Sequence, residues 1–321
     1  MAVHDGLGAG ADDAVARRER LSRLESIRIT YPRWQHVVDE IGRCHEMHGV
    51  AAEPQCLLLV GPTGAGKSTL VASYAQRYLP VVDEAGIGRP VVRATIPTPA
   101  TVKALASALL AALGDPRAAW GTVGSMTYRL TNHFRDCWVE LLILDELQHF
   151  RDRDNRRVLE NASNWLKTLI KETGVACVLV GLQGEAEEVV RVNRQLARLF
   201  GDAHVLLPFT WDERTPETVR EFRTFLGLLE GLLPLPEPSG LAEYETARRL
   251  HLASEGIVAY LMELVRRATY LAIAQGHARL DGPLLAMAFE QRLAGVRRGI
   301  TNPFMGGARL SRENGEGNAL D

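Results

Sequence analysis

The protein has 321 residues, of which 46% are hydrophobic and 24% charged, and this composition excludes a disordered or fibrous chain. Its length allows one large domain or two modest ones. Lys and Arg (37) nearly balance Asp and Glu (39), so the net charge of −2 excludes a globally basic nucleic-acid coat but allows a local basic surface. The apolar runs fall far short of the ~20 residues of a membrane span, and the N-terminus lacks a secretory pattern. We therefore expect a cytoplasmic protein without membrane contact.

In chain order, the first expected parts are a flexible tail over residues 1–20 and an N-terminal helical extension over 21–50, interrupted where Pro32 disfavours helix at Tyr31. Residues 51–212 alternate strand-like and helical segments, which predicts an α/β domain with a parallel five-stranded sheet flanked by helices. The strands are expected at 56–60, 91–96, 141–144, 175–181 and 203–207, and the helices at 67–78, 101–113, 126–136, 157–172 and 184–199. Helical patterns over 213–296 predict a small C-terminal all-α lid, and residues 297–321 a second flexible tail.

The first expected strand runs directly into a loop that matches GxxxxGK[ST] in the strand–loop–helix setting that this motif requires. Backbone N–H groups of such a loop cradle a polyphosphate, with the N-terminus of a helix behind them. Lys67 is expected to reach the β- and γ-phosphates, and the Ser68 hydroxyl to ligate Mg²⁺, which predicts ATP and Mg²⁺ as cofactors. The full set of expected nucleotide-binding residues in this loop is Gly61, Pro62, Thr63, Gly64, Ala65, Gly66, Lys67, Ser68 and Thr69.

A second motif lies well downstream, where four apolar residues at 141–144 end in Asp145 and Glu146. Asp145, at the carboxyl end of a buried strand, is expected to take part in nucleotide binding and to complete the ligand shell of the Mg²⁺ ion. Glu146 is expected to polarise the attacking water as a general base. The interval after Lys67 holds a whole helix–strand–helix, so we expect another strand between the two motif strands in the sheet. This layout is typical of NTPases with an additional strand and a catalytic glutamate.

With a helical unit directly after the fifth strand, this layout resembles the AAA+ class of P-loop NTPases. The resemblance implies a polar sensor after the fourth strand, for which Gln183 is the best candidate, with a helix-capping glutamine as the alternative. It also implies an arginine finger, presented to a neighbouring subunit's nucleotide, with Arg198 as first choice and Arg194 as second. The lid departs from the AAA+ pattern, because residues 254–260 contain no sensor arginine.

The segments SIRITYPRW at 26–34, GPTGAGKST at 61–69 and LDELQHF at 144–150 resemble the TniB family of transposition ATPases, which are relatives of TnsC. The resemblance covers most of residues 25–295, and one departure is Leu199, where a second arginine is expected. It implies a regulator rather than a DNA-cutting enzyme. ATP-bound protomers would form rings or helical filaments on target double-stranded DNA without sequence specificity, recruit a transposase and a TniQ-type targeting partner, and disassemble on slow, assembly-dependent hydrolysis.

A near-neutral chain needs oligomerisation to repeat the few cations with which each protomer contacts DNA phosphates. The candidates lie between the second and third expected strands: Lys103 first, then Arg117, Thr122 and Arg129. Two other functions stay open from the sequence. One is an AAA+ helicase loader, which would use the same nucleotide site on a different partner, and the other is a nucleotide-switched DNA scaffold with little turnover.

Overall fold

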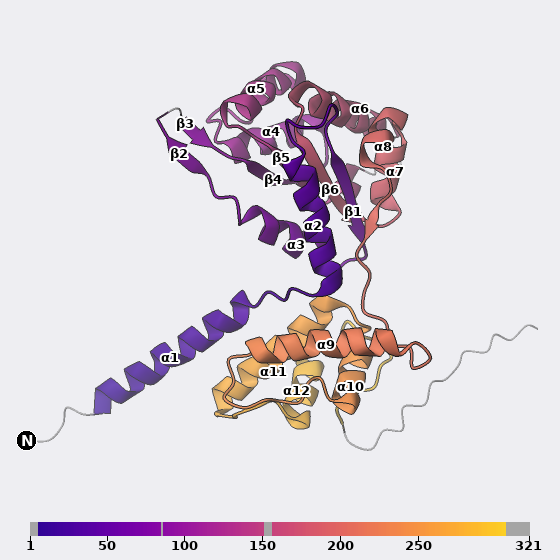
Figure 1. Ribbon diagram of the computed structural model, residues 1–321. Helices are drawn as coiled ribbons and strands as arrows, with labels where there is room; N and C mark the ends of the chain where they lie inside the picture. The colour runs from indigo at the N-terminus through magenta and orange to yellow at the C-terminus, as the bar shows by residue number, and fades with distance from the viewer. Residues whose placement is uncertain (1–5, 85, 151–155, 306–321) are drawn as a thin grey trace, which may run out of the picture. The chain divides into compact units, whose positions relative to one another are not determined.

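The computed structural model describes residues 6–84, 86–150 and 156–305, which group into two compact units (Figure 1). One unit runs from Thr30 to Leu207 and contains the sheet. The other combines the described residues up to Ile29 with those from Pro208 onward. The polypeptide therefore leaves the helical unit, completes the sheet unit and returns.

A five-stranded sheet forms the centre of the first unit. Its strands pair in parallel in the order β4-β5-β6-β1-β7. Their bounds are β1 (Cys56–Gly61), β4 (Val91–Thr95), β5 (Leu141–Asp145), β6 (Ala176–Leu182) and β7 (His204–Val205). Because β6 lies between β1 and β5, the predicted extra strand between the two motif strands is confirmed. The loops after these strands all leave from the carboxyl edge of the sheet, where open α/β sheets bind ligands.

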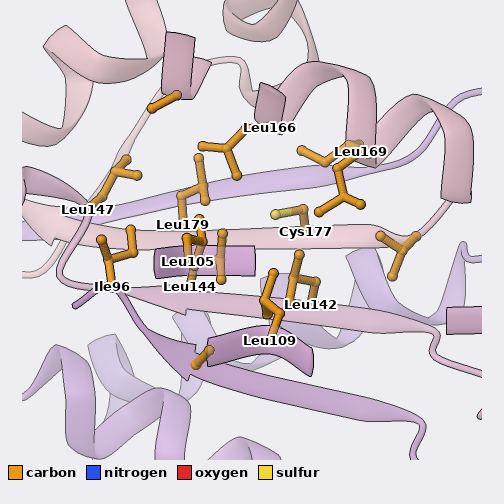
Figure 2. Close-up of a cluster of buried hydrophobic side chains, with 14 of the residues drawn as sticks. Ile96, Leu105, Leu109, Leu142, Leu144, Leu147, Leu166, Leu169, Cys177 and Leu179 are labelled. Carbon is orange, nitrogen blue, oxygen red and sulfur yellow. The ribbon is translucent and has the colours of Figure 1, made fainter. Parts of the chain in front are cut away.

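Helices pack against this sheet on both faces. On one face, α2 (Pro32–Glu46) and α3 (Lys67–Ala75) contact β1 and β6. On the other, Leu105 and Leu109 meet alternate residues of β5 and β6 such as Leu142 and Leu179 (Figure 2). The helices that contribute to this second core are α4 (Val102–Leu113), α5 (Val123–Asp136), α6 (Arg156–Thr173), α7 (Glu185–Arg191) and α8 (Arg194–Phe200). Burial on both faces explains why the central strands read as continuous apolar runs.

Two features of the sheet unit differ from the prediction. The helix expected over 184–199 is two helices, because Asn193 begins α8: its Oδ1 accepts the N–H groups of Gln195 at 2.9 Å and Leu196 at 3.1 Å. The other feature is an antiparallel pair outside the main sheet, β2 (Val81–Asp83) and β3 (Gly86–Gly88). Strands of three residues are too short to show an alternating pattern in the sequence.

The second unit consists of α1 (Gly6–Ser26), α9 (Pro216–Leu232), α10 (Tyr244–Ser254), α11 (Val258–Gln275) and α12 (Gly282–Arg292). Its four later helices confirm the predicted C-terminal all-α part. Gly256, between α10 and α11, is required there: its φ is 69°, and a Cβ would lie 1.8 Å from the carbonyl oxygen of Phe209. Within the ranges that the structure describes, no helix has the length and apolarity of a membrane span.

Helix α1 corrects two predictions at the N-terminus. Residues 6–20 are helical rather than a tail, and the extension predicted over 21–50 is divided between the two units. Leu24 is only 2% exposed, and Arg20 Nε donates to the carbonyl oxygen of Pro234 at 3.0 Å, so the helix packs on the helical unit. The predicted C-terminal tail also starts too early, because Asn302 and Phe304 are buried. Residues 306–321 lie outside the described residues.

Candidate functional site

The phosphate loop joins β1 to α3 in a conformation that needs glycine at two positions. Gly64 (φ 81°) and Gly66 (φ 98°) adopt the left-handed region, and Gly66 is the N-cap of α3. Such a curl turns backbone N–H groups toward a common centre, and the first N–H groups of a helix have no intrahelical acceptor. Space is open around the point where a Cβ would stand on Gly66. This donor set and this opening fit the phosphates of a nucleotide.

Lys67 is the buried cation of the loop. Its side chain folds back so that Nζ donates to the carbonyl oxygens of Gly61 at 2.8 Å and Pro62 at 2.9 Å. Burial lowers the pKa of Lys67, while the charges of Glu146 and then Asp145 act in the opposite direction. Hydrogen bonds from an ammonium to anionic oxygens are stronger than those to neutral carbonyls. Phosphate oxygens therefore compete well for this ammonium.

The second motif lies at the carboxyl end of β5. Asp145 is 3% exposed, and its Oδ1 accepts the N–H of Glu146 at 2.9 Å. Its Oδ2 lies 4.0 Å from Nη1 of Arg93, which projects from β4. Glu146 is half-buried and has a φ of 63°, a backbone conformation that costs a non-glycine residue about 1 kcal/mol or more. The surrounding contacts must hold it there.

Two oxygen-bearing side chains fit a magnesium ion at this edge of the sheet. Ser68 is exposed in the first turn of α3, which follows β1, and Asp145 is the last residue of β5, with β6 between these two strands in the sheet. Hydroxyl and carboxylate oxygens are the ligands that Mg²⁺ prefers, usually together with phosphate oxygens and waters. When bound, the ion would neutralise charge on the β- and γ-phosphates.

The predicted sensor and arginine-finger residues are placed at the surface. Gln183 follows β6 directly and is exposed. Arg194 and Arg198 are exposed on α8, whose buried side carries Leu196 and Phe200. The spacing of four puts the two arginines on one face of the helix. This orientation leaves both guanidinium groups available to a neighbouring molecule.

The structure separates the four candidate DNA contacts into two pairs. Lys103 and Arg117 are exposed. The Thr122 hydroxyl accepts the N–H of Ser125 at 3.3 Å as the N-cap of α5. Arg129 forms an ion pair with Asp115 at 3.0 Å, and its guanidinium also donates to the carbonyl oxygens of residues 117 and 120. Thr122 and Arg129 thus hold the segment between α4 and α5 in place.

The family membership of this chain follows from a match to a protein-family model. The family model described as "TniB: Bacterial TniB protein" matches residues 20–209, which is more than half of the chain. The protein belongs to the TniB family. The match includes both nucleotide motifs, the segment 26–34 and the residues after Glu146, so the resemblance inferred from the sequence is confirmed. Comparison with curated proteins gave no match.

Several solved structures share the fold of this TniB-family chain. CDC6P from Pyrobaculum aerophilum has a TM-score of 0.60 at 13% identity, covering 87% of this chain and 74% of that one. Aeropyrum pernix ORC2, in ADPNP and ADP complexes, has a TM-score of 0.57 at 18% identity, with coverages of 80% and 67%. Aeropyrum pernix ORC1, in complex with DNA, gives 0.55 at 20% identity, with coverages of 79% and 64%. At these identities the likeness shows the fold alone, and it agrees with the predicted five-stranded parallel sheet flanked by helices and followed by an all-α part.

Two residues at the TniB-family site were not assigned a role from the sequence. Arg93 faces Asp145 from the neighbouring strand, and no motif contains it. Gln148, in the single-turn helix η1 (Leu147–Phe150), was part of the family resemblance, but its contacts with Glu146 and with β6 depend on the folded sheet. A polar residue two positions after Glu146 is the only signal that the sequence offers for it.

Proposed function

We propose that this protein is an ATP-dependent regulator of DNA transposition. In the ATP state it assembles as a ring or filament on target double-stranded DNA, recruits a transposase and a TniQ-type partner, and disassembles on hydrolysis. Membership of the TniB family, together with an intact set of nucleotide-site side chains, carries this proposal. The fold similarity to Aeropyrum pernix ORC1, whose structure contains DNA, is consistent with it.

The separate roles that the side chains at the carboxyl edge of the sheet can take support ATP hydrolysis. The loop N–H groups and Lys67 bind the phosphates, and Ser68 and Asp145 hold Mg²⁺. Glu146, in the first position after β5, accepts a proton from the attacking water. Gln183 lies at the end of β6, where a polar side chain senses the γ-phosphate. A DNA scaffold with little ATP turnover would not need a general base. The presence of Glu146 therefore favours ATP hydrolysis over the scaffold function.

Hydrolysis in trans is the expected consequence of the exposed arginines on α8. Arg198→Ala should lower DNA-stimulated ATP turnover by about a hundredfold or more, because a finger neutralises charge that develops on the transferred phosphoryl group. Mixing Arg198→Ala with Glu146→Gln protomers should restore part of the rate, because the latter donate Arg198 to sites that retain Glu146. Steady-state phosphate release across mixing ratios measures this. No recovery at any ratio would assign the finger elsewhere, with Arg194→Ala as the next variant.

DNA contact is best assigned to Lys103 among the four candidates. Lys103→Ala should weaken assembly on duplex DNA, and should reduce the slope of log Kobs against log[salt] by ~0.9 for each lost contact. Fluorescence anisotropy between about 50 and 200 mM salt, with a non-hydrolysable ATP analogue, measures both effects. Lys171→Ala, at an exposed position on α6, is the matched control. An unchanged salt slope for Lys103→Ala would remove this residue from the DNA interface.

The decisive experiment for the whole proposal is electron microscopy of the protein with duplex DNA and either ADP or an ATP analogue. Rings or filaments on DNA with the analogue, and none with ADP, are expected. A helicase loader would assemble without binding a transposase, so co-purification with a co-encoded transposase separates these functions. Assembly without any ATP turnover would instead favour the nucleotide-switched scaffold.

A further inference from the structure

Gln148 joins the catalytic carboxylate to the end of the neighbouring strand. From η1, its Nε2 donates to Oε2 of Glu146, and its Oε1 accepts the N–H of Leu182, the last residue of β6, at 3.0 Å. Leu182 is paired in register with Gly61, the first residue of the phosphate loop. The amide of Gln148 therefore connects Glu146, the proposed general base, with the end of β6. This strand end precedes Gln183 and lies beside the start of the phosphate loop.

The chemistry of the two partners explains why an amide stands here. An ionised carboxylate only accepts hydrogen bonds, and a backbone N–H only donates. A bridge between them needs an acceptor and a donor on one side chain, which glutamine provides and glutamate, lysine or arginine does not. The same two partners fix the orientation of the amide, because the reversed orientation would face donor to donor and acceptor to acceptor.

The packing around the amide leaves it little freedom. A Cβ at Gly181 would lie 2.9 Å from Oε1 of Gln148 and 2.7 Å from Cβ of Ala186, so only glycine fits beside the bridge. Leu147 and Phe150, on either side along η1, are fully buried. Glu146 itself has the strained φ of 63°. The Glu146 carboxylate that Gln148 contacts therefore belongs to a residue with a strained backbone, and the closely packed turn η1 follows it directly.

We propose that Gln148 is a positioning residue for ATP hydrolysis: it fixes one oxygen of the Glu146 carboxylate, leaving the other for the water, and couples that orientation to the end of β6. This inference rests on the proposed ATPase function. A shift of β6 when Gln183 meets the γ-phosphate would move the Leu182 N–H, and with it the amide that orients Glu146. The base would then be aligned only when the nucleotide is correctly seated.

Two variants separate positioning from a merely structural role. Gln148→Glu keeps the acceptor for the Leu182 N–H, but it replaces the donor with an oxygen that faces Glu146. Gln148→Ala removes both contacts. Both should lower the single-turnover rate of ATP hydrolysis by about tenfold or more, because small misplacements of a catalytic group are costly. The Kd for a non-hydrolysable ATP analogue should stay within about twofold of the wild-type value. Gln55→Ala, an exposed glutamine, is the matched control and should change neither quantity.

The outcomes distinguish this inference from the proposed function. If the wild type hydrolyses ATP and Glu146→Gln does not, but Gln148→Glu keeps the wild-type rate, the positioning role is overturned while the ATPase function stands. If the wild type does not hydrolyse ATP, both are overturned. If Gln148→Glu lowers the melting temperature, Gln148→Ala decides by the same comparison of rate with Kd. In a Glu146→Gln background, Gln148→Ala should cause no further loss of rate, and an additive loss would also contradict the proposal.

Discussion

Lys67→Ala is expected to weaken ATP binding by about a hundredfold or more and to abolish nucleotide-dependent assembly on DNA. The variant removes the ammonium for which phosphate oxygens would compete with the loop carbonyls, and hydrogen bonds to charged groups contribute about 1.5–3 kcal/mol each. The fold should survive, since in the structure Nζ contacts only two carbonyl oxygens of its own loop. Titration with a fluorescent ATP analogue, followed by sedimentation with duplex DNA, measures both effects.

The matched control for this prediction is Lys171→Ala, which removes an exposed lysine and should leave ATP affinity and assembly unchanged. Lys67→Arg is a more stringent comparison. Its planar guanidinium is larger and presents its donors in a fixed fork, so it should not restore binding in a loop shaped for a compact ammonium. Normal DNA assembly by Lys67→Ala would separate assembly from nucleotide binding, and would contradict the ATP-gated function.

The parts of this site that the sequence predicts are those that depend on neighbours along the chain. Lys67 and Ser68 follow from the spacing of glycines after a strand, and Asp145 and Glu146 from their place after four apolar residues. The fold follows for the same reason, because alternating strands and helices restrict the topology to a few arrangements. These requirements involve residues that are close together along the chain, so they can be recognised in a single sequence.

The parts that the sequence does not predict depend on lateral contacts. Arg93 faces Asp145 only because β4 pairs with β5, and Gln148 reaches Leu182 only because β6 lies on the other side of β5. The assignment of α1 to the helical unit has the same origin. It depends on contacts such as that of Arg20 with Pro234, more than two hundred residues away along the chain. No local pattern encodes such a partner.

The near-neutral charge of the chain is compatible with a regulator that has to release DNA. With Thr122 and Arg129 engaged in internal contacts, each protomer offers few candidate cations to DNA, and Lys103 and Arg117 are the exposed ones of those predicted. Under the proposed function, binding would depend on how many protomers assemble, because phosphate contacts add along the duplex. Hydrolysis that dissolves the assembly would then also release the DNA, so the proposed step at Glu146 would control both.

Glu146→Gln is expected to lower the rate of ATP hydrolysis by about 10²- to 10⁴-fold, the usual contribution of a general base, while ATP affinity changes little. The amide has nearly the shape of the carboxylate but does not accept a proton from water. Protein–DNA assemblies formed with ATP should therefore persist for as long as wild-type assemblies formed with a non-hydrolysable analogue. Phosphate release and the lifetime of fluorescent DNA complexes after dilution measure the two effects. Wild-type turnover in this variant would assign the base elsewhere, and rapid disassembly without turnover would show that release does not depend on hydrolysis.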